Sequence, residues 1–547
     1  VGAAGALVLE RVQRATSLAV PASCTDQQDP VQAELFRHRF MAIAEQMGEQ
    51  LRQSSRSVNI RERLDFSCAL FDAAGTLVAN APHIPVHLGS MGDSVRDLVG
   101  QVDLGAVPSL QPGDTLLSND PFHGGTHLPD ITAITPVFCG GAAPSFFVAS
   151  RGHHADVGGI SPGSMPSFSH RIDEEGLLLR NLLFVRDGRI NHTRWEQVCA
   201  GIAIPPRNPI ELLADLQAQV AANQAGVNAL QRLVDREGQA MVQRQMDALQ
   251  SHAARCVSRV LERLDDGDHQ LQLDDGSVLA VAIRLERGRQ RLTLDFTGTS
   301  DQRAGNFNAP LAVTRSVVLY VIRCLLEDDI PLNEGCFTPL ELAVPLGSML
   351  NPRPPAAVVA GNVEVSQALC NLLFGAFGVL AAGQGTMNNL SFGDGERQYY
   401  ETVAGGGGAG VGFNGSVAFQ THMTNSRLTD PEVLETRYPV RLERFAIRAG
   451  SGGDGQWRGG DGLERTIRFL EPMTVSLISG SRRVPPFGLH GGESGACGVN
   501  LHLGIDGAER RLAGAVQLEL KAGEAIQLLT PGGGGMGASR RSDDECV

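Results

Sequence analysis

The chain has 547 residues, of which 42% are hydrophobic and 19% are charged, and its formal net charge is −14. This composition is typical of a folded globular protein of roughly three to four domains, and it excludes a largely disordered chain. Since the chain is acidic, has 5% aromatic residues and lacks any run of 18 apolar residues, we expect neither a nucleic-acid partner nor a membrane-spanning segment.

Residues 1–207 are predicted to form an N-terminal α/β region with loops rich in His and Asp. A first helix is predicted to begin after Asp29, because Pro30 suits the first helical position and apolar residues then recur at helical spacing. Between residues 58 and 150, short apolar runs such as LDFSCALFD and SFFVAS alternate with turns. We expect these runs to be strands of a mixed sheet.

Residues 208–265 are predicted to form a helical hairpin. Asn208, Pro209 and Glu211 have the order of an N-cap, a first-turn proline and a capping-box acid, and Gly238 divides the apolar pattern in two. We expect this hairpin to pack against the rest of the molecule or to dimerise, and we expect the protein to be an oligomer.

The remaining chain is predicted to form a central α/β region, residues 266–440, and a β-rich C-terminal module, residues 441–547. Together these regions predict a multi-domain α/β protein of mixed α+β character. Glycine accounts for 65 of the 547 residues, and we expect its clusters to form tight turns, with an anion-binding nest as the alternative. These clusters lie at 403–415, 450–462, 485–498 and 531–537.

Histidine is concentrated in one part of the chain. Two stretches in this part, SNDPFHGGTHLPD (118–130) and RGHHADVGG (151–159), combine His and Asp with Gly and Pro. Each follows a predicted strand, so we expect two rigid polar loops that face each other at neighbouring strand ends. Seven of the fourteen histidines lie between residues 83 and 170, namely His83, His87, His123, His127, His153, His154 and His170.

These two loops predict a metal site. Imidazole nitrogen and carboxylate oxygen are ligands that suit divalent Zn, Mn or Fe. His127 and Asp130 are three residues apart and could bind one ion from a single turn, while His153, His154 and Asp156 could supply the remaining ligands. The alternative is that these residues hydrogen-bond one another and hold the loops. His83 and His87 are expected to lie on a loop, because Pro82 and Pro85 disfavour a regular helix. They could line the site, and a purely structural role is the alternative.

Polar residues also gather in later stretches of the chain. Asn388 and Asn389 lie in GTMNNLSFG, and Arg427 lies in HMTNSRLTD. The amides could hydrogen-bond a small polar substrate, and Arg427 could bind a carboxylate with two hydrogen bonds. The alternative is loop capping by the same groups. Tyr400, Glu401, His422 and Asn425 are weaker candidates of the same kind.

Lysine and cysteine usage restricts the chemistry further. Lys521 is the only lysine, so the chain has no P-loop of the Walker type. The ten cysteines are scattered and form no C-x-x-C pair, so we expect no cysteine-based zinc or iron–sulfur site. Dispersed cysteines of this kind favour a cytoplasmic location.

Six ordered blocks of sequence resemble the hydantoinase B/oxoprolinase family. They are SNDPFHGGTHLPDITAITPVF, ASRGHHADVGGISPGSMP, GTMNNLSFG, YYETVAGGGGAG, HMTNSRLTDPEVLETRYPV and RVPPFGLHGGESG. The resemblance covers about residues 30 to 537. Within the family, residues 37–72 and the stretch NAPHIPVHLGSM are most similar to the C-terminal portion of the ATP-dependent enzymes that open the lactam of 5-oxo-L-proline to L-glutamate.

The resemblance implies a division of labour. A hydantoinase A-type subunit or domain with an actin-like fold binds ATP and Mg and phosphorylates the amide, and the B-type portion completes ring opening. A chain that begins at Val1 would fit one part of a divided polypeptide or a separate B subunit. Three alternatives stay open: an ATP-hydrolysing N-methylhydantoinase subunit, an acetone- or acetophenone-carboxylase-type subunit, and a non-catalytic partner of the A-type ATPase.

The resemblance also implies roles for the clustered residues. In carboxylase relatives a His-x-x-Asp pair and a downstream His bind a divalent metal, which maps to His127, Asp130 and His153, with His154 as the alternative to His153. Asp120, His154 and Asp156 are then expected to support the metal ligands or to act as a base.

Overall fold

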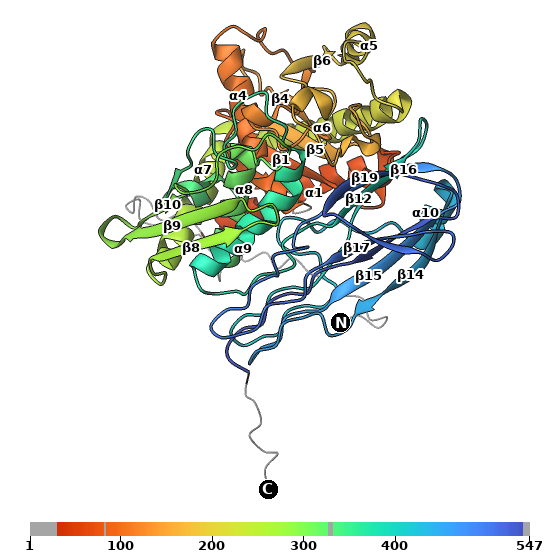
Figure 1. The fold of residues 1–547 in the computed structure, drawn as a ribbon. Helices are drawn as coiled ribbons and strands as arrows, with labels where there is room; N and C mark the ends of the chain where they lie inside the picture. The colour runs from red at the N-terminus through yellow and green to blue at the C-terminus, as the bar shows by residue number, and fades with distance from the viewer. Residues whose placement is uncertain (1–29, 81–83, 327–331, 540–547) are drawn as a thin grey trace, which may run out of the picture.

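The computed structural model describes residues 30–80, 84–326 and 332–539, so His83 lies outside the described residues. Its helices and sheets confirm the mixed α+β class. Figure 1 shows the N-terminal part, coloured red to yellow, above the blue C-terminal strands, with the green central part beside both. Among the described residues no helix is both long and apolar enough to cross a membrane.

The N-terminal part is built on a seven-stranded sheet with the order β2-β1-β5-β4-β3-β6-β7. Every neighbouring pair is antiparallel, so the prediction of a mixed sheet is wrong. The links 119–129 and 138–145 are too short for the crossover of a dozen or more residues that parallel neighbours need. The strands are β1 (Phe66–Asp72), β2 (Leu77–Asn80), β3 (Thr115–Ser118), β4 (Asp130–Val137), β5 (Phe146–His153), β6 (Leu182–Arg186) and β7 (Arg189–Ile190).

Helices cover both faces of this sheet. On one face, α1 (Pro30–Ser54) and α6 (Pro209–Glu237) share a core with β1 and β5, to which Phe40, Phe66 and Val148 belong. On the other face, α4 (Met91–Asp103) contributes Val95 to a core with Ile134. Three shorter helices are α2 (Val58–Arg61), α3 (Pro85–Leu88) and α5 (His192–Ala200).

The predicted pair of helices begins and breaks where its sequence indicates. The Asn208 side chain accepts a hydrogen bond from the Glu211 amide and caps α6. Gly238, with a φ of 84°, separates α6 from α7 (Gln239–Leu261). The left-handed backbone at this position favours glycine over residues that carry a side chain.

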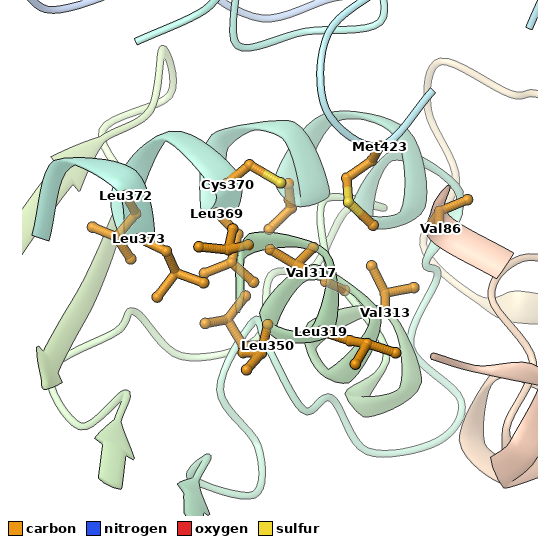
Figure 2. Packing of buried hydrophobic residues seen from close by; sticks show 14 of the residues in the cluster. Val86, Val313, Val317, Leu319, Leu350, Leu369, Cys370, Leu372, Leu373 and Met423 are labelled. Atoms are coloured by element: carbon orange, nitrogen blue, oxygen red, sulfur yellow. The ribbon is translucent and has the colours of Figure 1, made fainter. Parts of the chain in front are cut away.

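The central part combines a four-stranded sheet with two buried helices. The sheet has the order β11-β10-β9-β8, and β10 and β11 are parallel neighbours. The helices α8 and α9 pack together in a core that also includes Val86, the residue before His87 (Figure 2). The elements are β8 (Gly267–Gln272), β9 (Val278–Glu286), β10 (Arg291–Asp295), α8 (Leu311–Cys324), β11 (Leu340–Ala343) and α9 (Ser366–Ala376).

Two antiparallel sheets make up the C-terminal part and share one hydrophobic core. Their orders are β13-β12-β16-β19 and β14-β15-β20-β17-β18. Because β12 and β13 precede residue 440, one of these sheets uses strands from both sides of the predicted domain limit, and the limits themselves stay a prediction. The elements are β12 (Asn389–Gly393), β13 (Gln398–Thr402), α10 (Pro431–Arg437), β14 (Val440–Arg448), β15 (Gly462–Phe469), β16 (Met473–Ile478), β17 (Val499–Leu503), β18 (Glu509–Leu512), β19 (Ala515–Leu520) and β20 (Ala525–Leu529).

The glycine clusters bring backbone segments into direct contact. The Gly460 amide donates to Gly407 O and the Gly533 amide donates to Gly460 O, each at 2.9 Å. A Cβ atom on Gly406 would lie 2.0 Å from Gly460 O, and one on Gly533 would lie 1.9 Å from Gly407 O. Close backbone approach, and not the tight turn that we expected, therefore requires glycine at these positions.

Candidate metal centre

The two His/Asp loops meet at one edge of the N-terminal sheet. Strands β3 and β5 both run antiparallel to their common neighbour β4. Therefore β3 ends at Ser118, β4 begins at Asp130 and β5 ends at His153 along the same edge. Asp130 and His153 are direct partners in the register of β4 and β5. The prediction that the loops face each other is confirmed.

Three buried side chains converge at this edge. His127 Nε2 and His153 Nδ1 each lie 3.0 Å from Asp130 Oδ1, and the two nitrogens are 3.2 Å apart. If both imidazoles donate to the same oxygen, their N–H groups crowd each other, whereas one cation would satisfy all three atoms together. His127, Asp130 and His153 thus form a group that could hold a metal ion, and we call it the triad.

The second oxygen of Asp130 has partners of its own. Thr126 Oγ1 donates to Asp130 Oδ2 at 2.5 Å, and His87 Nε2 lies 3.3 Å from the same atom. The other nitrogen of His87 lies 3.2 Å from Ser67 Oγ. Burial tends to raise the pKa of Asp130, but the charges of His127 and His87 and the hydrogen bonds hold this pKa well below its usual value. Asp130 is therefore a carboxylate at neutral pH.

Of the two adjacent histidines, only His153 belongs to the triad. Successive residues at a strand end point to opposite faces, and His154 Nε2 lies 3.0 Å from Gln219 Oε1 on α6. Burial lowers the pKa of both His153 and His154. A neutral imidazole is the form that binds a metal ion.

Tyr400 on β13, in the C-terminal part, packs against the triad. Its ring stacks on His153 with centroids 4.8 Å apart, and Arg63 lies over Tyr400, 4.8 Å from its centroid. The Tyr400 hydroxyl donates to Asn389 Oδ1 at 2.8 Å. The C-terminal part therefore contributes directly to the surroundings of the triad.

Comparison with known proteins shows to which family the chain belongs. A family model described as Hydantoinase B/oxoprolinase matches residues 29–539. The chain belongs to this family. 5-oxoprolinase 1 of Arabidopsis thaliana is 45% identical over 93% of this chain and 42% of its own length. 5-oxoprolinase of Dictyostelium discoideum is 45% identical over 94% of this chain and 41% of its own length.

A solved structure shares the same fold. The ATP-dependent caprolactamase from Pseudomonas jessenii superposes with a TM-score of 0.83 at 24% identity, covering 94% of this chain and 92% of that chain. At this identity the likeness concerns the fold alone. The chain spans about two fifths of the length of the two 5-oxoprolinases that it matches.

In this member of the hydantoinase B/oxoprolinase family, Asp120 and Asp156 lie outside the triad. Asp120 caps the short turn η1 (Pro121–His123), and its Oδ2 lies 2.7 Å from His123 Nδ1. Asp156 accepts hydrogen bonds from the amides of Gly158, Gly163 and Arg207 and from the Arg207 guanidinium. Burial raises the pKa of Asp156. Both carboxylates thus anchor local loops, and their role as supports of the metal ligands or as a base stays a prediction.

The three predicted substrate-binding residues make hydrogen bonds to protein groups. Asn388 donates to Gln384 Oε1 and Val403 O and accepts from Arg482. Asn389 donates to Glu364 and Ile478 O and accepts from Tyr400. Arg427 is exposed, and its backbone amide donates to Arg63 O. Asn389 thus contacts Tyr400, and Arg427 contacts Arg63, which lies over the same ring beside His153. The substrate-binding role of all three residues stays a prediction.

At the centre, sequence reasoning gave His87 only a possible site-lining role and gave Thr126 none. His87 and Thr126 bind the carboxylate of Asp130. Thr126 could have been suspected because it directly precedes His127. His87 sits on the single helical turn α3, so the expected loop is wrong at this residue: Pro85 occupies the first turn, where proline is compatible with a helix. No local pattern links His87 to Asp130.

Proposed function

We propose that the chain is the B-type portion of an ATP-dependent 5-oxoprolinase, which opens the lactam of 5-oxo-L-proline to L-glutamate. The supporting observation is the buried triad, set in a chain that is 45% identical to proteins named 5-oxoprolinase. An A-type portion with an ATP and Mg site would be its partner. The 5-oxoprolinases are longer than this chain, which leaves room for such a portion in them.

The chemistry of a lactam explains why two portions are needed. Resonance makes the amide carbon a poor electrophile, and phosphorylation of its oxygen in the A-type portion weakens that resonance. What remains is addition of water to the activated carbon, cleavage of the carbon–nitrogen bond and release of phosphate, which together give glutamate. His127, Asp130 and His153 would hold a divalent cation of the Zn, Mn or Fe class beside this bond. Such a cation supplies Lewis acidity to a carbonyl or phosphoryl oxygen.

The surrounding residues would keep the triad in position. Thr126 and His87 hold one oxygen of Asp130, which leaves the other directed at both triad imidazoles. Tyr400 fixes the ring plane of His153 by stacking. We propose that His154, Asp120 and Asp156 act as supports of the loops, since each already has a protein partner.

Metal analysis combined with a coupled assay tests the proposal. The complete enzyme that contains this chain should form glutamate from 5-oxo-L-proline and ATP. His127→Ala should lose the bound metal and most of the ring opening. His123→Ala is the matched control, because His123 belongs to the same loop but pairs with Asp120. Full ring opening by metal-free protein would remove the role of the triad.

The same assay separates the alternatives. An N-methylhydantoinase would release ADP with N-methylhydantoin and not with 5-oxo-L-proline. A carboxylase would require bicarbonate. A non-catalytic partner would retain turnover after both His127→Ala and His153→Ala. Any of these outcomes would replace the proposed function.

A further inference from the structure

Arg151 is a fully buried arginine on β5, two residues before the triad ligand His153. In the register of β4 and β5, Arg151 pairs with Thr132, and His153 pairs with Asp130. Side chains two residues apart on a strand point to the same face of the sheet. The Arg151 side chain therefore lies on the face of the triad and next to it.

The guanidinium of Arg151 donates hydrogen bonds to groups from three parts of the chain. Its Nε donates to Thr132 Oγ1 on β4 at 2.7 Å. Its Nη1 donates to Ser90 Oγ, directly before α4, and its Nη2 donates to Ser94 Oγ on α4 and to Gly124 O, at 3.0 and 3.1 Å. A guanidinium can make such a set of bonds because its N–H groups are fixed in one plane, which those of an ammonium group are not.

Two of these acceptors lie on segments that carry triad ligands. Gly124 belongs to the loop that carries His127, and Thr132 lies on β4 two residues after Asp130. Arg151 itself lies on the strand that ends at the third ligand. One guanidinium is thus attached to each of the three segments that meet at the triad.

A further acceptor, Ser90, connects Arg151 to the residue that supports Asp130. The Ser90 hydroxyl accepts from Arg151 and donates to His87 O at 3.0 Å. His87 Nε2 in turn lies 3.3 Å from Asp130 Oδ2. The position of the turn α3, which carries His87, therefore depends on the same guanidinium.

The loop of His127 contacts α4 at the point where Arg151 binds both. Gly124 has a φ of 92°, and a Cβ atom on it would lie 2.2 Å from Ser94 N. The backbone of the loop and the backbone of the helix therefore touch at Gly124 and Ser94. Arg151 Nη2 donates to a group of each of these two residues, so it holds the contact together.

The partners of Arg151 do not neutralise its charge. The four acceptors are three hydroxyls and one carbonyl, all of them neutral. Burial lowers the pKa of Arg151 to about 10, against the charges of Asp130 and Asp93, so the guanidinium is still charged at neutral pH. A buried charge without a directly bound counter-charge is costly. Its benefit is therefore expected in the arrangement of the segments that it joins.

We propose that Arg151 is a positioning residue of the metal centre, which holds the loop of His127 against the strands that carry the other two ligands. The proposal rests on the role of the triad in the proposed function. Residues that hold metal ligands in place typically change the metal affinity 10–100-fold, and the arrangement of the ligands also selects among metals. Arg151 acts through these ligands, and no covalent bond forms or breaks at it.

Titration of the full chain with Co²⁺ tests the proposal, because the visible absorption of bound Co²⁺ depends on the number and arrangement of its ligands. Arg151→Lys keeps the positive charge and loses the planar set of N–H groups. We expect Arg151→Lys to bind Co²⁺ about 10–100-fold more weakly than the unchanged chain, with an altered absorption spectrum. A spectrum and an affinity equal to those of the unchanged chain would overturn the proposal.

Arg482→Lys is the matched control. Arg482 is also buried, burial also lowers its pKa to about 10, and it donates to the neutral acceptors Asn388, Asn500 and Gly480 O. We expect this variant to keep the Co²⁺ spectrum and affinity even if it is less stable. Equal changes of the spectrum in Arg482→Lys and Arg151→Lys would show a general loss of packing and would refute a specific role of Arg151.

Ser94→Ala tests the same contact from the acceptor side, and it keeps the test decisive if Arg151→Lys fails to fold. It removes one acceptor of Arg151 Nη2 and should weaken Co²⁺ binding about three- to tenfold, as loss of one hydrogen bond does. Ser55→Ala is its control, because this buried hydroxyl of the N-terminal part donates to Leu51 O. Equal affinities of these two serine variants would count against the proposal.

Glutamate formation is measured separately, so the two proposals can fail independently. Co²⁺ binding that depends on Arg151, without glutamate formation by the complete enzyme, would overturn only the proposed function. Glutamate formation together with Co²⁺ binding that depends on His127 but not on Arg151 would overturn only the positioning role. Co²⁺ binding that does not depend on His127 would remove the triad from both proposals.

Discussion

Two buried clusters of ionisable residues differ in how completely their polar atoms are paired. In the C-terminal part, the Arg465 guanidinium donates to both oxygens of Glu401 at 2.7 and 2.8 Å, and Tyr399 donates to the same carboxylate at 2.8 Å. In the triad, one carboxylate oxygen faces two imidazoles, and His127 Nδ1 and His153 Nε2 have no hydrogen-bond partner in the described part of the chain.

The difference separates a structural cluster from a binding cluster. The Glu401–Arg465 pair has one negative and one positive charge with matched geometry, so no further group is needed. The triad brings three electron-pair donors together, and none of the three is a fixed positive charge such as a guanidinium. Both clusters are buried, so burial alone does not distinguish them; the hydrogen-bond partners do.

The largest expected effect concerns the Glu401–Arg465 pair. Arg465→Ala leaves the Glu401 carboxylate buried without its partner, and we expect a loss of about 3–5 kcal/mol in the free energy of unfolding. Urea unfolding measures it. Arg468→Ala is the matched control on the same strand, because its pair with Glu443 is partly exposed and should contribute only about 0.2–1 kcal/mol. Equal losses in both variants would contradict the comparison.

A third buried carboxyl, that of Glu175, accepts hydrogen bonds from uncharged groups. It accepts from the amides of Val358 and Val359 and from Ser169. Burial raises the pKa of Glu175 to about 7 from its ordinary 4.5, in spite of these hydrogen bonds. A pKa raised on folding stabilises the protein below about pH 4.5, and this stabilisation is lost as the pH rises through about 7.

The variant Glu175→Gln isolates this pH dependence. Between pH 5 and 9 the unchanged protein should lose on the order of 3 kcal/mol in stability relative to the variant. Urea midpoints of both proteins at several pH values give the difference. Parallel pH profiles would show that Glu175 titrates at its ordinary pKa.

Local patterns in the sequence predicted part of this structure. The cap at Asn208 and the break at Gly238 depend on neighbouring residues only, and both were predictable. The order of the strands in the N-terminal sheet was not predictable, because strand runs do not encode their partners. The close contacts of Gly406 and Gly533 also depend on segments far apart in the chain.

The triad could be predicted from residues close together in the sequence, but its surroundings could not, because they come from distant segments. His127 and Asp130 are three residues apart, so their spacing indicates a shared ion. The choice between His153 and His154 needs the strand register, which sets the face of each side chain. Tyr400 reaches His153 across almost 250 residues of sequence, and no local pattern could place it there.

The smallest expected effect concerns a partner that supports a triad ligand. His87→Ala removes the imidazole beside Asp130 Oδ2 and leaves His127, Asp130 and His153 in place. Residues that support metal ligands typically contribute 10–100-fold in affinity, so we expect metal binding to weaken by about that factor. Titration of the apo protein with Zn or Mn under a competing chelator measures it.

A conservative variant separates orientation from simple loss of structure. Thr126→Ser keeps the hydroxyl that binds Asp130 and should leave metal affinity within about threefold, while Thr126→Val should resemble His87→Ala. Unchanged affinity in both His87→Ala and Thr126→Val would mean that Asp130 needs no support. Its contacts with His127 and His153 would then be enough to hold this carboxylate in place.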